Sequence, residues 1–368
     1  MRFLLSGYYG FANLGDEALL EIIVAQLRAR YPYAEIDVLS ATPAETAHDY
    51  RVIATPRADL ASVKRAIERA DVVLSGGGGL LQNATSLKSL LYYAGIIRSA
   101  VRTGRKTMIF AQSIGPLDFI GKQTVRECCK GVQAATVRDE RSRELLAPLL
   151  GGVPVERAAD PVFLFDFEES GRRRLRVYDL GPESDPLVVV SVRKTANFTD
   201  GIGRIVAAVD RLADLGARIV FLPFGGATDA VASTAIIRRC RSTPLLLPVD
   251  DLAGAARLIS RARLVIGVRL HALILAVRFG VPFLAVPYDP KVSSLCDDIA
   301  YLLPPLWTPG ARAGSESDPA ALAQRAWEQH DALADALAVA AVRMRELALR
   351  NFEVLDALVE GPAPSARR

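Results

Sequence analysis

The strongest constraint on the fold is a regular alternation of short apolar runs with longer amphipathic ones. The first five apolar runs of the 368-residue chain lie at Phe3–Ser6, Glu35–Leu39, Asp71–Ser75, Thr107–Ala111 and Ala135–Arg138. Helix-like stretches separate or follow them, at Asp16–Arg30, Leu60–Ala70, Leu87–Thr103, Lys122–Ala134 and Glu140–Leu149. Short apolar runs are typical of strands buried on both faces. Strands that alternate with helices form a parallel sheet covered on both sides.

The alternation stops in a charged stretch near residues 165–186 and then starts again. The second set of expected strands lies at Leu187–Val192, Arg218–Leu222, Leu245–Leu247, Leu264–Ile266 and Phe283–Val286. We therefore predict an α/β protein with a Rossmann-like domain over residues 1–165, a linker over 166–186, and a second Rossmann-like domain over 187–315. A helical tail over 316–368 would pack across the domains. Two such domains facing each other would form a cleft at the carboxyl ends of their strands, where ligands bind.

Composition excludes several classes of protein. Hydrophobic residues make up 51% and charged residues 23%, which excludes a disordered chain. The 45 Lys and Arg against 41 Asp and Glu give a net charge of only +4, so we expect no nucleic-acid partner. Uncharged apolar runs are too short to span a membrane. The four cysteines lack metal or redox spacing and only three His are present, so we expect no metal and a cytoplasmic location.

Two glycine-rich turns in the first half are candidate binding loops. The first, over residues 7–17, follows a strand and would place Asn13, Asp16 and Glu17 at a ligand. The alternative is that Asp16 only caps or charges the start of the helix. In the second turn, successive N–H groups could converge on an anion, or the glycines could only allow a tight turn. That turn consists of Gly76, Gly77, Gly78 and Gly79.

Basic side chains follow several of the expected strands. Arginine binds carboxylates and phosphates through two parallel hydrogen bonds, so these positions predict a small anionic ligand. A surface pair with Asp139 is the alternative for Arg138, and a structural role is the alternative for His271. Tyr288 and Asp289 end the last strand. The five cations are Arg138, Arg193, Lys194, Arg269 and Lys291.

In combination, these segments resemble the polysaccharide pyruvyl transferase family and, within it, the CsaB type. The resemblance covers residues 1 to about 300. It is carried by Gly7–Ala18, Ser75–Gln82, Gln112–Pro116, Val137–Ser142, Ala159–Pro161, Gly267–Ala272 and Tyr288–Lys291. It implies a GT-B-like pair of Rossmann domains and pyruvyl transfer from phosphoenolpyruvate. The acceptor would be a hexosamine similar to the N-acetylmannosamine of a lipid-linked secondary cell-wall polysaccharide precursor. The product would be a 4,6-pyruvate ketal, of the kind that anchors S-layer homology domains.

The chemistry of such a transfer matches the candidate residues. Phosphoenolpyruvate is the co-substrate, and its phosphate and carboxylate need the five cations; no other cofactor and no metal are expected. We predict that His271 is the acid–base catalyst, with Asp16 or Asp289 assisting it. The glycines of the second turn, Asn13, Glu17 and Tyr288 complete the predicted substrate-binding set. A lipid-linked acceptor also implies peripheral contact with the inner face of the membrane.

Two other functions remain open from the sequence. A nucleotide-sugar-dependent GT-B glycosyltransferase would use the same fold, and Asp289 could then bind the ribose. A non-catalytic carbohydrate-binding protein would retain the fold but would be expected to lose the cations at the strand ends.

Overall fold

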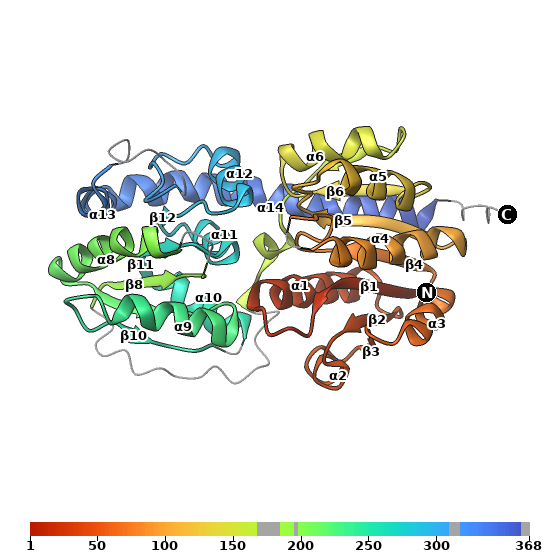
Figure 1. Cartoon of the computed structure of the whole chain (residues 1–368), viewed down its shortest axis with the longest axis horizontal. Coiled ribbons are helices and arrows are strands. Elements are labelled where there is room, and N and C mark those ends of the chain that lie inside the picture. The colour runs from red at the N-terminus through yellow and green to blue at the C-terminus, as the bar shows by residue number, and fades with distance from the viewer. Residues whose placement is uncertain (85, 168–184, 195–197, 250, 309–316, 362–368) are drawn as a thin grey trace. The chain divides into compact units, whose positions relative to one another are not determined.

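The computed structural model describes residues 1–84, 86–167, 185–194, 198–249, 251–308 and 317–361 (Figure 1). The chain divides into two compact units. The first contains Met1–Leu164 and Met344–Arg368, and the second contains Phe165–Arg343. Most of the predicted linker, residues 168–184, lies outside the described residues. The same is true of residues 309–315 at the end of the predicted second domain, and of residues 316 and 362–368 of the predicted helical tail.

The first unit is built on a seven-stranded parallel sheet with the strand order β3-β2-β1-β4-β5-β6-β7. Its strands are β1 (Arg2–Tyr9), β2 (Glu35–Ser40), β3 (Ile53–Pro56), β4 (Val72–Gly76), β5 (Lys106–Gln112), β6 (Ala134–Val137) and β7 (Val155–Arg157). The order reverses between β1 and β4, which pair directly from Phe3–Val72 to Ser6–Ser75. In open α/β sheets, ligands bind beyond the carboxyl ends of the strands at this reversal.

Helices connect these strands, and polar caps set where most of them begin. They are α1 (Leu14–Arg30), α2 (Pro43–Tyr50), α3 (Leu60–Arg69), α4 (Leu87–Arg102), α5 (Phe119–Cys128) and α6 (Glu140–Leu146), with short 3-10 turns at Ala147–Leu149 and Pro161–Leu164. A side-chain oxygen accepts a backbone N–H at the start of five of them, which satisfies a donor that the helix leaves unpaired. The capping residues are Asn13, Asp59, Ser86, Asp118 and Asp139.

Three elements of the first unit are not predicted by the alternation. The edge strands β3 and β7 have four and three residues, and their polar or partly exposed positions give no apolar run. Helix α2 has eight residues and buries only Thr46. Helix α5 also begins at Phe119 rather than Lys122, because Asp118 accepts the Gly121 N–H at 2.7 Å and caps it there.

The second unit repeats the arrangement with a five-stranded parallel sheet of order β10-β9-β8-β11-β12. Its strands are β8 (Leu187–Ser191), β9 (Arg218–Phe221), β10 (Leu245–Leu246), β11 (Ala262–Gly267) and β12 (Phe283–Ala285). Its helices are α8 (Phe198–Asp214), α9 (Gly226–Ile237), α10 (Leu252–Ser260), α11 (Leu270–Arg278), α12 (Pro290–Asp298) and α13 (Pro319–Glu328). Here the order reverses between β8 and β11, so the ends of these two strands define the second expected binding edge.

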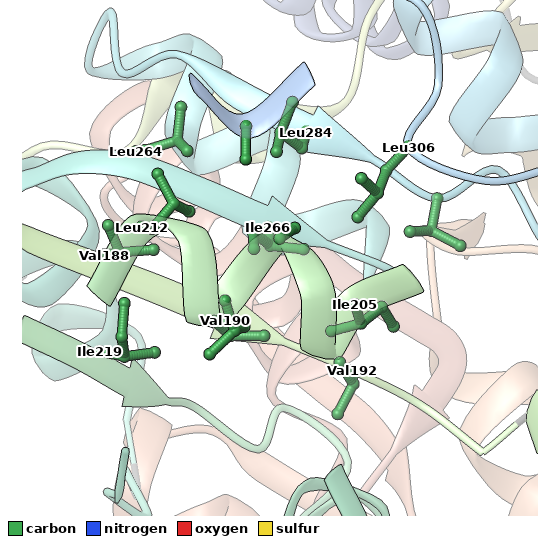
Figure 2. Close-up of a cluster of buried hydrophobic side chains, with 14 of the residues drawn as sticks. Val188, Val190, Val192, Ile205, Leu212, Ile219, Leu264, Ile266, Leu284 and Leu306 are labelled. Carbon is green, nitrogen blue, oxygen red and sulfur yellow. The ribbon is translucent and has the colours of Figure 1, made fainter. Parts of the chain in front are cut away.

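Aliphatic side chains from strands and helices fill the core of the second unit. Figure 2 shows Val188 and Val190 of β8, Ile266 of β11, and Ile205 and Leu212 of α8 in one buried cluster. Burial of each such side chain stabilises the fold by about 1.5–3 kcal/mol relative to exposure. The tight packing of both faces explains why these strands read as continuous apolar runs.

The last helix, α14 (His330–Glu360), contributes residues to both units. Within the first unit, its Asn351 side chain donates to the Ala159 carbonyl at 2.8 Å, and the Lys106 ammonium donates to the Val359 carbonyl at 2.7 Å. The predicted class, an α/β protein with two parallel sheets and a C-terminal helix, is therefore confirmed. In the part of the chain that the structure describes, no helix is long and apolar enough to cross a membrane.

Candidate functional site

The carboxyl ends of β1 and β4 bring the two glycine-rich turns of the first unit together. The Tyr9 hydroxyl at the end of β1 donates to the Gly76 carbonyl at the end of β4, at 2.8 Å. Asn13 caps α1 by accepting the Gly15 N–H at 3.3 Å, and its amide donates to the Asp16 carboxylate. The structure therefore places Asn13, Asp16 and the glycine run at one edge, as the strand order requires.

Two of the four glycines have a backbone conformation that favours glycine. Gly77 and Gly78 have φ angles of +75° and +79°. A Cβ at Gly78 would lie 2.7 Å from the Asp16 Oδ1 atom. The Asp16 carboxylate thus lies directly against the loop, and its negative charge disfavours a second anion beside Gly78. This arrangement suits a ligand with hydroxyl groups better than a phosphate.

Glu17 lies one residue further along α1 and holds the first turn closed. Its carboxylate accepts the Gly10 N–H at 2.7 Å and the Tyr50 hydroxyl at 3.0 Å. Burial raises the pKa of Glu17 above its ordinary value, and the charge of Asp16 adds to this effect. The two hydrogen bonds oppose it. Glu17 is therefore a carboxyl group that keeps its proton to a higher pH than an exposed glutamate.

An exposed aromatic pair lies at the end of β1 and in the turn that follows it. The rings of Tyr8 and Phe11 stack with centroids 4.1 Å apart, and each side chain is about two-fifths exposed, at 40% and 41%. The Arg57 guanidinium lies 4.8 Å from the Phe11 ring centroid, within cation–π distance. Flat aromatic faces next to hydrogen-bonding groups are suited to a ligand that is apolar on one face and polar at its rim.

Arg138, at the end of β6, is buried within a polar network. It forms an ion pair with Asp160, and its Nη2 atom donates to the Ser113 hydroxyl at 2.8 Å. That hydroxyl lies 3.2 Å from the Asp139 carboxylate, so Ser113 links the arginine to the residue expected as its alternative partner. Arg138 is only 6% exposed, and its charge is largely committed to Asp160. Its role in ligand binding stays a prediction.

In the second unit, Arg269 follows β11 and is fixed by a carboxylate from α9. Its Nε and Nη2 atoms donate to the two oxygens of Asp229, at 2.7 and 2.6 Å. Asp229 is fully buried and also accepts the Gly225 N–H at 2.7 Å. A Cβ at Gly225 would lie 2.0 Å from the Arg269 Nη2 atom, so the close approach of Arg269 requires glycine there.

Arg193, after the neighbouring strand β8, is oriented by Tyr288. Its Nη1 atom donates to the Tyr288 hydroxyl at 2.9 Å, and its guanidinium lies 5.4 Å from the ring centroid. Burial opposes the positive charge, but Tyr288 together with the carboxylates of Asp229 and Asp289 outweighs burial, so the pKa of Arg193 is raised. Lys194, the next residue, is exposed.

The remaining predicted residues lie at the starts of α11 and α12. His271 is half-buried in the first turn of α11, two residues after Arg269. Asp289 caps α12 by accepting the Lys291 N–H at 3.0 Å, and its Oδ2 atom lies 3.8 Å from the Lys291 Nζ atom. Arg193 and Arg269 therefore each follow one of the adjacent strands β8 and β11. The third strand, β12, ends at Ala285, before Tyr288 and Asp289, so Lys291 lies in the helix after it and not at the strand end.

Several partners in these sites are not predicted from the sequence. Asp229 lies 40 residues from Arg269, and its only sequence signal is its place just after a glycine-containing turn, in the first turn of α9. Tyr8 and Phe11 belong to the first turn, but their stacking depends on its folded geometry. Among the residues that the structure describes, no group of three His, Cys, Asp or Glu side chains could hold a metal ion.

Solved structures of similar fold span nearly the whole chain. Anabaena HepE in complex with UDP and glucose has a TM-score of 0.62 at 11% identity, covering 98% of this chain and 100% of that chain. A putative UDP-N-acetylglucosamine 2-epimerase from Listeria monocytogenes has a TM-score of 0.68 at 11% identity, covering 100% and 99%. The UDP-GlcNAc 2-epimerase from Neisseria meningitidis bound to UDP-GlcNAc has a TM-score of 0.64 at 10% identity, covering 98% and 100%.

At such low identity these likenesses define the class by fold alone, a GT-B-like pair of Rossmann-type units. The family is given by sequence: the model of the polysaccharide pyruvyl transferase family matches residues 13–290. The chain belongs to this family and is a transferase, which confirms the resemblance at the level of the family. Comparison with curated proteins gives no match.

Proposed function

We propose that this transferase moves the pyruvyl group of phosphoenolpyruvate onto a hexosamine of a lipid-linked cell-wall polysaccharide precursor. The product is a 4,6-pyruvate ketal, and phosphate is released. The observation that carries the proposal is the placement of Arg193 and Arg269 at the ends of the adjacent strands β8 and β11, in a member of the pyruvyl transferase family. The resemblance to the CsaB type extends the proposal to an acceptor similar to N-acetylmannosamine.

The second unit supplies the donor side of the proposed reaction. Phosphoenolpyruvate carries a phosphate and a carboxylate, and Arg193, Lys194, Arg269 and Lys291 offer cations beyond the strand ends for both groups. Asp229 keeps the Arg269 guanidinium in one orientation, so little conformational entropy is lost when a ligand binds. Fixed cations also stabilise the charge that develops on the leaving phosphate.

The chemical steps need one group that moves protons. In the first step, C3 of the enol takes up a proton and a sugar hydroxyl adds to C2, losing its own proton. In the second step, another hydroxyl of the same sugar bonds to C2 and loses its proton. The C2–O bond to phosphate breaks, and the phosphate leaves with the bonding electron pair and takes up that proton. We assign the proton transfer to C3 to His271, with Asp289 assisting in the same unit. General acid–base catalysis of this kind contributes about 10²–10⁴-fold to a rate.

The first unit supplies the proposed acceptor side. Sugar rings have apolar faces and hydroxyl rims, which match the exposed Tyr8–Phe11 stack and the carboxylates of Asp16 and Glu17. The Asp16 carboxylate at Gly78 supports assigning the glycine turn to a hydroxyl-bearing ligand rather than to phosphate. A lipid-linked acceptor places the enzyme in the cytoplasm at the inner face of the membrane, as part of the same proposal.

Ligand-induced stabilisation tests the proposal against a nucleotide-sugar glycosyltransferase, because UDP and UDP-sugars are bound in solved structures of similar fold. Phosphoenolpyruvate at about 100 times its dissociation constant would add about 2.7 kcal/mol to the free energy of unfolding. We expect a higher Tm with phosphoenolpyruvate and no change with UDP-glucose or UDP-GlcNAc. The Arg269→Ala variant should lose the shift. Stabilisation by the UDP-sugars alone would support the glycosyltransferase instead.

A further inference from the structure

A second feature of the first unit lies outside both candidate sites. Four large apolar side chains are exposed in the first two turns of α4 and the first turn of α5: Leu87, Leu91, Phe119 and Ile120, at 40%, 50%, 76% and 57%. Burial of large apolar groups is the dominant stabilising term in folding, so their exposure on two neighbouring helices marks an interaction surface. Lys88 and Lys122 are exposed within the same turns.

The two helix starts are held side by side by contacts between the loops before them. The Asn83 N–H donates to the Pro116 carbonyl at 3.2 Å, and the Asp118 N–H donates to the Asn83 side chain at 3.2 Å. Both loops leave the carboxyl ends of β4 and β5, which are neighbours in the sheet, and Figure 1 shows α4 and α5 next to each other. The six exposed side chains therefore lie on two adjoining helix starts, and we call this set the α4–α5 patch.

The charge of these helices indicates what covers the patch. Helices α4 and α5 together contain five basic residues and one acidic residue, and the whole chain has a net charge of only +4. The basic residues are Lys88, Arg98, Arg102, Lys122 and Arg126. The carboxylate of Asp118, next to the patch, is engaged as the cap of α5. Exposed apolar side chains beside lysines, on helices with an excess of basic residues, complement the boundary of a bilayer, where anionic headgroups lie above the acyl chains.

We propose that the α4–α5 patch docks the protein on the surface of an anionic phospholipid bilayer. Phe119, Ile120, Leu87 and Leu91 enter the headgroup region, and the lysines bind lipid phosphates. The α4–α5 patch lies at the same edge of the sheet as Asp16 and Gly78, so docking would bring a lipid-linked sugar to that edge. The delivery of a lipid-linked sugar rests on the proposed function. The docking itself depends only on the residues of the α4–α5 patch.

Flotation of the full-length protein with vesicles tests the docking without any use of its catalytic activity. We expect binding to phosphatidylcholine vesicles that contain phosphatidylglycerol, weaker binding at high salt, and little binding to phosphatidylcholine alone. The double variants Phe119→Asp/Ile120→Asp and Lys88→Glu/Lys122→Glu should each lower the bound fraction at least about fivefold. All four positions are exposed, so both variants should keep the Tm of the wild type.

Matched control variants show whether lost vesicle binding is specific to the α4–α5 patch or follows from added negative charge anywhere on the protein. Val339→Asp/Val342→Asp alters two exposed valines of α14, and Lys64→Glu/Arg65→Glu reverses two exposed cations of α3. Both should bind vesicles like the wild type. Equal binding to neutral vesicles, or unchanged binding by the patch variants, would overturn the proposal. Self-association that the patch variants abolish, without vesicle binding, would show that a second copy covers the patch and would also overturn it.

Discussion

The Arg269 guanidinium and the Asp229 carboxylate form a two-point pair, with donor–acceptor distances of 2.7 and 2.6 Å. Asp229 is fully buried, whereas the Arg269 side chain keeps 14% of its surface exposed. The buried Asp229 carboxylate therefore fixes the orientation of the Arg269 guanidinium. The guanidinium remains partly exposed to solvent just after β11. This is the geometry expected of a positioned anion-binding group.

Arg269→Ala should raise the KM for phosphoenolpyruvate by about 100-fold, because a charge-assisted bidentate contact is worth roughly 1.5–3 kcal/mol. It should also lower stability by about 3 kcal/mol or more, since Asp229 is left buried and unpaired. Steady-state kinetics and denaturant unfolding measure the two effects. Arg238→Ala, at an exposed arginine that ends α9, is the control. An unchanged KM would remove Arg269 from the donor site.

Gly78→Ala should destabilise the first unit by about 1–3 kcal/mol, because φ at this position is +79° and the added methyl group would meet the Asp16 carboxylate. Gly95→Ala is the matched control. Gly95 lies inside α4, and its added Cβ would have no atom within 4 Å, so this variant should be neutral or more stable by up to about 1 kcal/mol. Equal unfolding midpoints for the two variants would contradict the described turn.

Glu17 should make stability depend on pH in a defined direction. Burial raises the pKa of Glu17 in the folded state, so folding takes up a proton at pH values between the unfolded and folded pKa. The contribution of Glu17 to stability is then complete below about pH 4.5, the ordinary pKa, and falls as the pH rises through the folded value. Relative to wild type, Glu17→Gln should become more stable over this range. Denaturant unfolding from pH 4 to 8 measures the difference.

A second variant, Asp16→Asn, tests how much of the raised pKa of Glu17 is due to the neighbouring charge of Asp16. Asp16→Asn removes a nearby negative charge that raises the pKa of Glu17, so the pH-dependent loss of stability should move to lower pH. A difference between wild type and Glu17→Gln that stays constant with pH would show that Glu17 titrates normally.

In the first unit, the sequence predicts the interior strands but not the two edge strands, for a physical reason. The centres of strands β1, β4, β8 and β11 are buried, and each of these strands contains a run of at least three consecutive apolar residues. The edge strand β3 is the four-residue segment Ile53–Pro56 and needs only one partner, so its sequence carries no such signal.

The same limit applies to the candidate site. A position such as Arg269 is found because it follows a strand, and the carboxyl ends of parallel strands share one edge. Its partner Asp229 comes from another strand–helix unit and is identified only by the folded sheet order. Likewise, the sequence shows Asp16 and Gly78 as separate motifs, and their contact arises only because β1 and β4 are paired.

His271→Ala should lower kcat at least about 100-fold and change the binding of phosphoenolpyruvate by less than about tenfold, if the imidazole moves the proton to C3. His48→Ala is the control, because His48 lies on α2 and its side chain is 88% exposed. Single-turnover phosphate release separates the chemical step from binding. Near-wild-type turnover by His271→Ala would require another acid.

The most direct test of the account is to measure phosphate release and product together. The enzyme is incubated with phosphoenolpyruvate and a lipid-linked or synthetic N-acetylmannosamine acceptor, and in parallel with UDP-sugars. We predict one phosphate released for each pyruvate ketal found on the acceptor by NMR, with no reaction of the UDP-sugars. Release of UDP with sugar transfer, and no acceptor-dependent phosphate from phosphoenolpyruvate, would contradict the proposed function.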